Sequence, residues 1–290
     1  MDFRFAHRFR ERLRFAAKAT VRIGAIGAGL GFASFAFGEC GSPAGAVQVV
    51  AVDERLDIAL ADGRLVRLGG LDMPAPERGD PDLARKARDF LVARLVGRKA
   101  ELDLLASGTD RWDRTVADLS VSGGAGAQEA RGESIASALL SAGYARVTPE
   151  FETRDCAAAR LAVEDGARRA GLGIWRDPEY AVLPSFAAAA LRRRAGQFVV
   201  VEGRVRRVGF GRSRIYLDLA PHDGPTVVVA RNLEKALAES GHPVGELAGR
   251  TIRARGVLDD WPQPRLEITE SAMIEFPRRS DAQGVAEPRP

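Results

Sequence analysis

One short stretch of the chain, residues 62–77, holds a guanidinium and a carboxylate close together. It opens with the hairpin signal Asp-Gly and continues as an alternating strand that carries Arg67 between two apolar residues. Asp72 follows at the end of this strand, after two glycines that permit a bend and before two prolines that stop the strand. Phosphate chemistry uses such a pair, because a guanidinium grips phosphate oxygens and a carboxylate is a hard ligand for a metal ion.

Three motifs, in order along the chain, resemble those of the staphylococcal-nuclease-like (thermonuclease) family. Residues 67–77 resemble the family's R-L-x-G-I-D-A-P-E, residues 110–114 (Asp-Arg-Trp-Asp-Arg) resemble its D-R-Y-G-R, and residues 171–175 resemble its closing G-L-W. Together they place a domain of this family at residues 47–178. The resemblance implies an α+β fold, in which a five-stranded barrel of the OB type packs beside three helices.

The resemblance also implies a nuclease that hydrolyses phosphodiester bonds of DNA or RNA with Ca²⁺ as cofactor. In the family, two aspartates and a backbone carbonyl hold the calcium ion, a glutamate activates water, and two arginines bind the phosphate. Arg67 and Arg114 match the two arginines, and Asp72 matches one aspartate. The next residue, Met73, offers the carbonyl.

The second metal-binding aspartate departs from the family pattern. Counted back from Arg67 without a gap, its position falls on Leu56. Asp57 stands one residue away, and a slip of one residue turns a strand side chain to the opposite face. Asp53 reaches the site only through a longer hairpin. The candidate metal ligands are therefore Asp72, Asp57 and Asp53.

The catalytic glutamate is displaced as well. Ala75 occupies its position and Glu77 follows two residues later, where a bend at the two prolines would return its carboxylate to the site. The candidate catalytic residues are Arg67, Arg114 and Glu77. Asp113 replaces the family's glycine beside Arg114, and we expect the two to pair, which would draw the guanidinium away from phosphate.

Two other side chains invite a functional reading, and for each we favour packing. Trp112, within the second motif, is expected to pack in the core or against a helix rather than to stack on a base. Cys156 begins a predicted helix and is expected to be buried and inert.

The N-terminal segment predicts export. Residues 1–46 read as a signal peptide or an N-terminal membrane anchor, because a basic stretch precedes the uncharged apolar run 23–38, which is short for a membrane-spanning helix. Ala44-Gly-Ala46 fits the A-x-A cleavage pattern, so we expect a periplasmic chain that starts near Val47. The alternative is an uncleaved anchor, and only then would residues 23–38 contact the membrane. Cleavage would remove Cys40 and leave Cys156 as the remaining cysteine, so we expect no internal disulfide.

The overall charge gives no argument for nucleic-acid binding by the folded part. The whole chain of 290 residues carries a formal charge of +4. Seven of its 43 basic residues and three of its 39 acidic residues lie in residues 1–46, so the remainder carries 36 of each. Strong general affinity for polyanions is therefore not expected, and nucleic-acid binding would depend on local clusters.

Periodicity of apolar residues predicts the elements of the first domain. The expected helices are 82–96, 133–143 and 154–170, and the expected strands are 47–60, 65–71 and 116–121.

A second β-rich domain is expected at residues 196–278, after a linker at 179–195 and before a disordered tail at 279–290. Its five predicted strands have one helix between the third and the fourth, which is the order of an OB-fold. The strands are 198–208, 214–219, 226–229, 251–258 and 265–268, and the helix is 233–239. Candidate nucleic-acid-binding residues on the first strands are Arg204, Arg206, Arg212, Arg214 and Tyr216. The alternative is a solvated basic face.

Three functions therefore compete. The first is an exported, calcium-dependent nuclease. The second is a catalytically inactive module that binds nucleic acid or another polyanion. The third is an interaction protein of the cell envelope built from two barrels.

Overall fold

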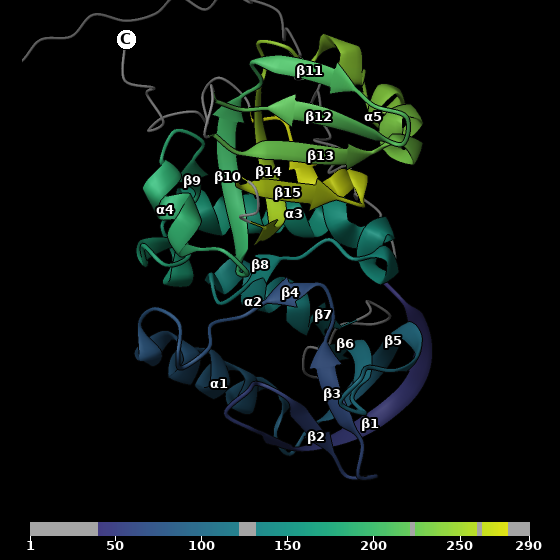
Figure 1. Cartoon of the computed structure of the whole chain (residues 1–290). Helices are drawn as coiled ribbons and strands as arrows, with labels where there is room; N and C mark the ends of the chain where they lie inside the picture. Colours follow the sequence, from purple (N-terminus) through teal and green to yellow (C-terminus); the bar gives the residue numbers. More distant parts are fainter. Residues whose placement is uncertain (1–39, 122–131, 221–223, 260–262, 278–290) are drawn as a thin grey trace, which may run out of the picture. The chain divides into compact units, whose positions relative to one another are not determined.

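The structure is a computed structural model, and it describes residues 40–121, 132–220, 224–259 and 263–277 (Figure 1). The predicted loop around 122–132, most of the expected leader and the expected tail lie outside these ranges. Among the described residues, no helix is both long enough and apolar enough to cross a membrane.

The first barrel is closed by five strands. They are β1 (Ser42–Val52), β2 (Ile58–Leu60), β3 (Leu65–Leu68), β5 (Lys99–Thr109) and β6 (Thr115–Val121). Antiparallel pairs join β3, β2, β1, β5 and β6 in that order, and a parallel pairing of β3 with β6 completes the ring. Inward residues such as Val49, Leu102 and Leu119 are fully buried, so strand alternation supplies the core.

Three helices cover this barrel, as the resemblance implies: α1 (Pro81–Leu95), α2 (Ile135–Ala142) and α3 (Arg154–Arg169). Asp80 caps α1 by accepting the Asp82 amide, and Pro81 stands in the first turn, where a proline costs no hydrogen bond. Gly143 ends α2 with a φ of 74°, a conformation that favours glycine. Two short strand pairs complete this half: β4 (Leu71–Asp72) with β8 (Arg146–Val147), and β7 (Glu133–Ser134) with β6.

The second barrel has the same topology. Its strands are β10 (Phe198–Arg204), β11 (Arg207–Phe210), β12 (Arg214–Asp218), β13 (Thr226–Ala230), β14 (Thr251–Asp259) and β15 (Arg265–Ile268). They follow the order β11-β12-β13-β15-β14-β10, and β13 runs parallel to β15. β10 and β11 are consecutive in the chain and together form the first strand of the barrel: β10 pairs with β14, and β11 pairs with β12. The smaller elements are β9 (Leu183–Pro184), α4 (Ala188–Arg193), α5 (Glu234–Glu239) and β16 (Ile274–Glu275).

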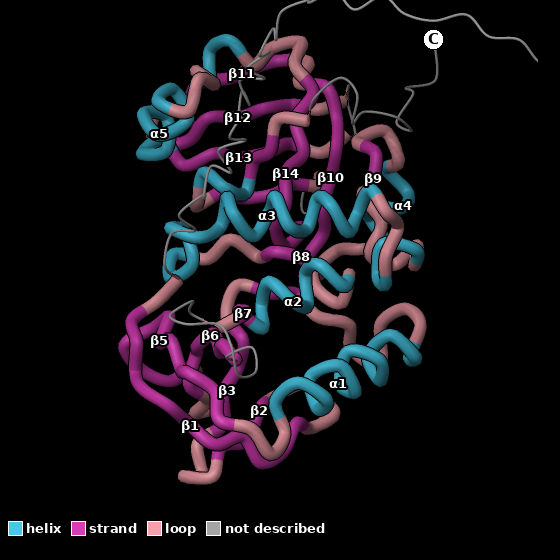
Figure 2. The backbone as a smooth tube through the Cα atoms, turned by 180° about the vertical axis from the view of Figure 1, so that it is seen from behind, coloured by secondary structure: helices cyan, strands magenta, loops and turns pink. Residues whose placement is uncertain are grey.

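Helix α3 lies between the two barrels in both ribbon views (Figures 1 and 2). Its Glu164 accepts two hydrogen bonds, of 2.9 and 3.0 Å, from Arg255 of β14, and neither side chain is exposed by more than 1%. Arg255 also pairs with Glu275 and donates to the Val147 carbonyl at 2.9 Å. A buried guanidinium with two carboxylate partners therefore fastens the second barrel to the first half of the chain.

A disulfide joins Cys40 to Cys156, with Cα atoms 5.4 Å apart, so the expectations of no internal disulfide and of an inert Cys156 are wrong. Cys40 lies two residues before the start of β1, and Cys156 lies in the first turn of α3. Ser42 already pairs with Leu104 of β5, so the folded barrel begins upstream of the expected start at Val47.

One further difference concerns the elements. Strand β5 was missing from the predicted set, although Ala100, Leu102 and Leu104 alternate within it.

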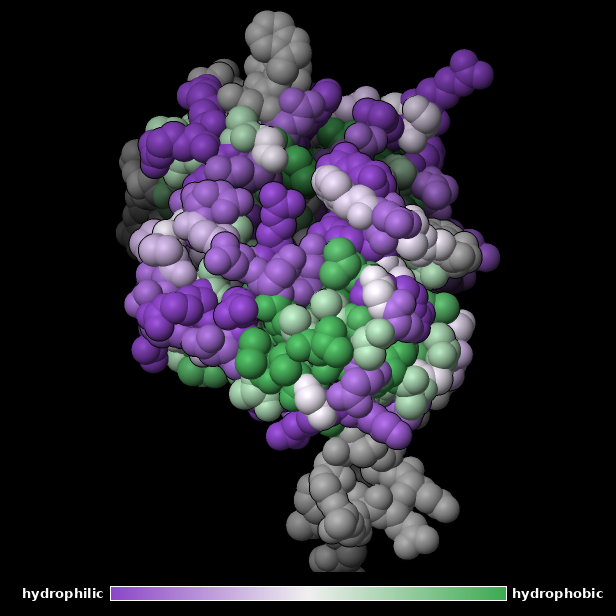
Figure 3. All heavy atoms as spheres, turned by 90° about the horizontal axis from the view of Figure 1, so that it is seen from below, coloured by the Kyte–Doolittle hydropathy of each residue, from purple (hydrophilic) through white to green (hydrophobic). Residues whose placement is uncertain are grey.

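Apolar side chains also lie on the outside of the first barrel. Figure 3 shows an apolar region on the face that contains β1 to β3 and α1. Val50 and Leu65, on β1 and β3, are 49% and 41% exposed.

Candidate active site

Arg67 projects from β3 because its neighbours Val66 and Leu68 are fully buried in the barrel. Its side chain is 26% exposed. Nη2 lies 3.4 Å from Glu150 Oε2, and Nε lies 3.7 Å from Asp110 Oδ2. Both contacts are long, so the guanidinium remains available to a stronger acceptor such as phosphate.

Arg114 enters the same site from the turn between β5 and β6. Asp110 shapes this turn by accepting the amides of Trp112 and Arg114, at 2.9 and 3.1 Å. It also accepts Nε and Nη2 of Arg114, at 2.9 and 2.7 Å. Burial raises the pKa of Asp110, but these hydrogen bonds outweigh burial and lower the pKa to about 2. Asp110 is therefore a permanent anion at neutral pH.

The expected pairing of Asp113 with Arg114 is wrong. Asp113 adopts a φ of 60°, and its carboxylate accepts the Thr109 hydroxyl at 3.1 Å. Trp112 is also not a core residue, because it is 57% exposed. The guanidinium carbons of Arg111 and Arg114 lie 3.8 and 4.8 Å from its ring centroid, so this indole is a solvent-facing surface beside the site.

Asp57 lies in the site, contrary to the expectation that its side chain would face the opposite side. Arg114 Nη1 donates to both of its carboxylate oxygens, at 2.9 and 3.0 Å. The preceding Leu56 has a φ of 66° and buries its side chain in the core. Because of this turn, the side chain of Asp57 points toward Arg114 although Asp57 stands one residue after the expected position. Asp53 instead caps the turn by accepting the amides of Arg55 and Asp57, at 2.9 and 2.8 Å.

Arg67, Arg114 and Asp57 line one cavity of about 490 Å³, to which we refer as the arginine pocket. Its walls include both arginines, Asp57, the loop from Met73 to Pro76, and Glu77. Glu77 is exposed and makes no ion pair with another described residue. The structure thus brings together all three candidate catalytic residues: Arg67 and Glu77 from the stretch 62–77, and Arg114 from the turn between β5 and β6.

Asp72 faces a neighbouring cavity of about 390 Å³. Arg78 Nη2 lies 2.7 Å from its Oδ1, while Arg146 donates to Oδ2 from Nη2 and Nε at 2.6 and 3.0 Å. Both oxygens are therefore engaged by arginines. Sequence reasoning missed Arg78 and Arg146, and also Glu150 and Asp110 beside Arg67.

The residues present do not fit a calcium ion. Calcium takes six to eight oxygen ligands, and its affinity follows the number of charged ligands. Within the described ranges, no three acidic, histidine or cysteine side chains converge as a metal site would require. Asp53 caps a turn, Asp57 is bound by Arg114, and Asp72 is bound by Arg78 and Arg146.

The candidate nucleic-acid-binding residues of the second barrel are all exposed, in two groups. Arg204 and Arg206 flank the break between β10 and β11, where Arg204 donates to the Gly249 carbonyl at 2.9 Å. The second group lies at and beyond the tight turn that joins β11 to β12, where Arg214 pairs with Glu267 at 3.0 Å and Tyr216 is 41% exposed. Phe210, which sequence reasoning missed, is 54% exposed near this turn.

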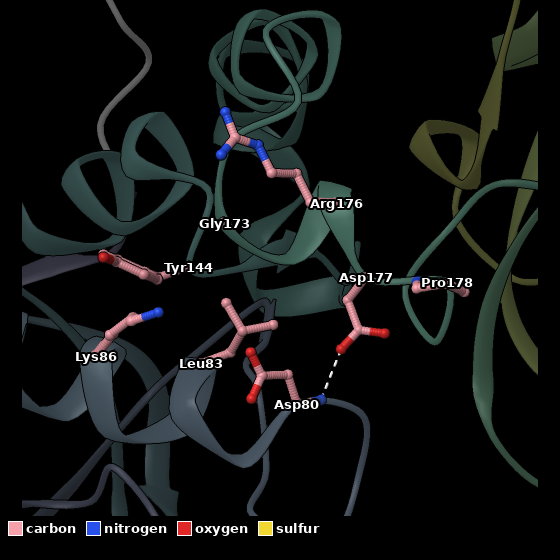
Figure 4. Close-up of a pocket in the computed structure, with 8 residues that line it drawn as sticks. All are labelled: Asp80, Leu83, Lys86, Tyr144, Gly173, Arg176, Asp177 and Pro178. Carbon is pink, nitrogen blue, oxygen red and sulfur yellow. Dashed lines mark hydrogen bonds between the residues drawn. The ribbon is translucent and has the colours of Figure 1, made fainter.

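A further cavity, of about 580 Å³, lies beside the first turns of α1 (Figure 4). Lys86, Tyr144 and Arg176 surround it, with Asp80 and Asp177 on another wall. The Asp80 amide donates to the Asp177 carboxylate at 2.7 Å, and this hydrogen bond links the start of α1 to the end of the first domain. None of the sequence-predicted site residues lines it.

Comparison with known proteins agrees with this geometry. Residues 65–177 match the family model described as staphylococcal nuclease homologue, a range that contains Arg67, Asp72, Glu77 and Arg114. No curated protein matches the sequence of the chain. Residues 65–177 therefore belong to a domain of the staphylococcal nuclease homologue family.

Proposed function

We propose that the arginine pocket binds the phosphodiester backbone of DNA or RNA and hydrolyses it. One observation carries this proposal: Arg67, Glu77 and the more distant Arg114 line a single cavity. The family match over residues 65–177 supports it, because it covers all three residues.

The chemistry follows from the position of each group. Arg67 donates to non-bridging phosphate oxygens, and Arg114 stabilises the negative charge that grows on phosphorus-bound oxygen in the transition state. Glu77 takes a proton from the attacking water as its oxygen bonds to phosphorus. The bond from phosphorus to the leaving oxygen breaks, and that oxygen takes a proton from solvent.

A second function, binding without hydrolysis, has its own supporting observation. Asp57 and Asp110 together engage every nitrogen of the Arg114 guanidinium, so the substrate must compete with two carboxylates for it. Arg67 would then supply most of the grip on phosphate.

An assay of hydrolysis distinguishes these two functions. Labelled single-stranded DNA and RNA are incubated with the full chain, once with calcium and once with chelator. Arg67→Ala should lower the rate by about 10²- to 10³-fold, as loss of a transition-state donor does. Glu77→Gln should lower it by about 10²- to 10⁴-fold. Arg64→Ala is the matched control, because Arg64 lies on the same hairpin, exposed and paired with Asp62 at 2.7 Å.

Each result decides between the proposals. Cleavage that is lost in both variants and kept in the control supports hydrolysis. Binding without cleavage, weakened by Arg67→Ala, supports the second function. Equal behaviour of Arg67→Ala and Arg64→Ala would contradict both.

We also propose that the chain is exported. The Cys40–Cys156 disulfide supports this, because disulfides persist in oxidising compartments such as the periplasm. If the leader is cleaved, cleavage should fall before Cys40 rather than after Ala46, since the latter would discard half of the disulfide and the paired start of β1. Intact mass spectrometry of the cell-fractionated protein tests both points. A non-reduced periplasmic chain that contains Cys40 and gains mass on reduction is expected; a chain beginning at Val47 would contradict the proposal.

A further inference from the structure

Arg78 stands where a cation would be expected. A single nitrogen, Nη2, lies 2.7 Å from Asp72 Oδ1 and 3.2 Å from the carbonyl oxygen of Met73. These are the two oxygens that the family resemblance assigns to calcium. A positively charged hydrogen-bond donor thus contacts both of the oxygens that a divalent ion would share.

The surroundings hold Arg78 in this place. Its guanidinium carbon lies 4.5 Å from the ring centroid of Tyr180, a fully buried residue whose hydroxyl donates to the Arg78 carbonyl at 3.1 Å. A guanidinium stays protonated in proteins at ordinary pH. The positive charge is therefore permanent.

A second arginine closes the other side of the carboxylate. Arg146 is 1% exposed, contacts Asp72 Oδ2 at 2.6 Å, and also donates to the carbonyls of Tyr180 and Phe198, at 3.2 and 3.1 Å. Guanidiniums occupy both oxygens of Asp72, and a divalent cation would have to displace them. A metal ion that took Asp72 away would leave Arg146 buried without its carboxylate, which is strongly unfavourable.

We propose that Arg78 is a built-in cation that replaces the divalent metal at Asp72 and Met73, so that this domain binds phosphodiesters without calcium at that position. The part that concerns phosphodiesters rests on the proposed function, and the part that concerns calcium does not. Asp72 then acts as a structural anchor: through Arg146 it ties the loop that borders the arginine pocket to the first residue of β10.

Calorimetric titration of calcium into the full chain tests this directly, together with thermal unfolding in calcium and in chelator. The wild-type chain should show no saturable calcium heat and no shift of Tm between the two conditions. Arg78→Ala frees Asp72 Oδ1 and the Met73 carbonyl, and should raise Tm in millimolar calcium relative to chelator. Arg78→Lys, which keeps the charge, should not respond. Arg85→Ala is the control, since Arg85 is exposed and pairs with Asp82 on α1.

Two results would overturn the proposal. One is saturable calcium binding by the wild-type chain that Asp72→Asn weakens by tenfold or more. The other is a folded Arg78→Ala chain whose Tm is the same in calcium and in chelator. If Arg78→Ala does not fold, the comparison of wild type with Asp72→Asn still decides. None of these readouts measures hydrolysis, so failure here is distinguishable from failure of the proposed nuclease.

Discussion

The two barrels share one strand order but place their arginines in different environments. In the first barrel, Arg67 and Arg114 have side chains 26% and 16% exposed and line a cavity. In the second, Arg253 and Arg255 of β14 are 3% and 0% exposed. Arg67 of the first barrel is therefore available to a ligand, whereas Arg253 and Arg255 of the second are committed to internal carboxylates.

The third strand of each barrel, β3 in the first and β13 in the second, shows that one outward-facing residue makes the difference between a binding and a buried position. Both pair in parallel with the last strand of their barrel, β3 with β6 and β13 with β15. Arg67 projects outward from β3, whereas three consecutive valines, 227–229, make the middle of β13 almost fully buried. Topology thus supplies a scaffold, and single outward positions decide whether that scaffold can bind phosphate.

Among the changes considered, removal of Arg255 should lower the stability of the chain most. A small loss of stability would contradict the contrast between structural and available arginines. Arg255→Ala leaves Glu164 buried without its cation, and loss of one partner of a buried pair costs about 3–5 kcal/mol. The free energy of unfolding, measured with urea, should fall by that amount.

The matched control for this change is Arg265→Ala. Arg265 pairs with Asp259, and both side chains are more than 40% exposed, so the loss should stay below about 1 kcal/mol. Equal losses in the two variants would show that burial does not separate structural from available arginines in this chain.

Much of the fold could be predicted from the sequence because it depends on local signals. Alternating apolar residues indicated β3 and β6, and a helical stripe with glycine after it indicated α1 and α2. Strand β5 carries a similar alternation and was still missed, because Leu104-Leu105 and Ala106 interrupt the pattern.

The site was less predictable because its geometry depends on unusual backbone and on distant partners. Asp57 reaches Arg114 only because Leu56 adopts a positive φ, which is uncommon for a residue other than glycine. Asp72 is turned toward Arg146, 74 residues further along the chain, and no local pattern announces that contact. The disulfide, which spans 116 residues, was missed for another reason: the cleavage pattern at residues 44–46 placed Cys40 in the segment expected to be removed.

Changes on the exposed face of the second barrel should give the smallest effects and sharpen the comparison most. Arg214→Gln removes a side chain that is 47% exposed and already paired with Glu267, so affinity for single-stranded DNA should fall only a few-fold. If Arg214 contacts phosphate, the slope of log affinity against log salt should also decrease by about one.

Tyr216→Ala should lower the affinity for single-stranded DNA by about fivefold, the low end for loss of one stacked base. Lys235→Gln on α5, 85% exposed, is the control and should match wild type, as measured by fluorescence anisotropy at several salt concentrations. If both test variants also match wild type, this face is a solvated basic surface and the first barrel binds alone. If either variant loses as much affinity as Arg67→Ala, the second barrel carries the nucleic-acid contact and the contrast between the barrels is reversed.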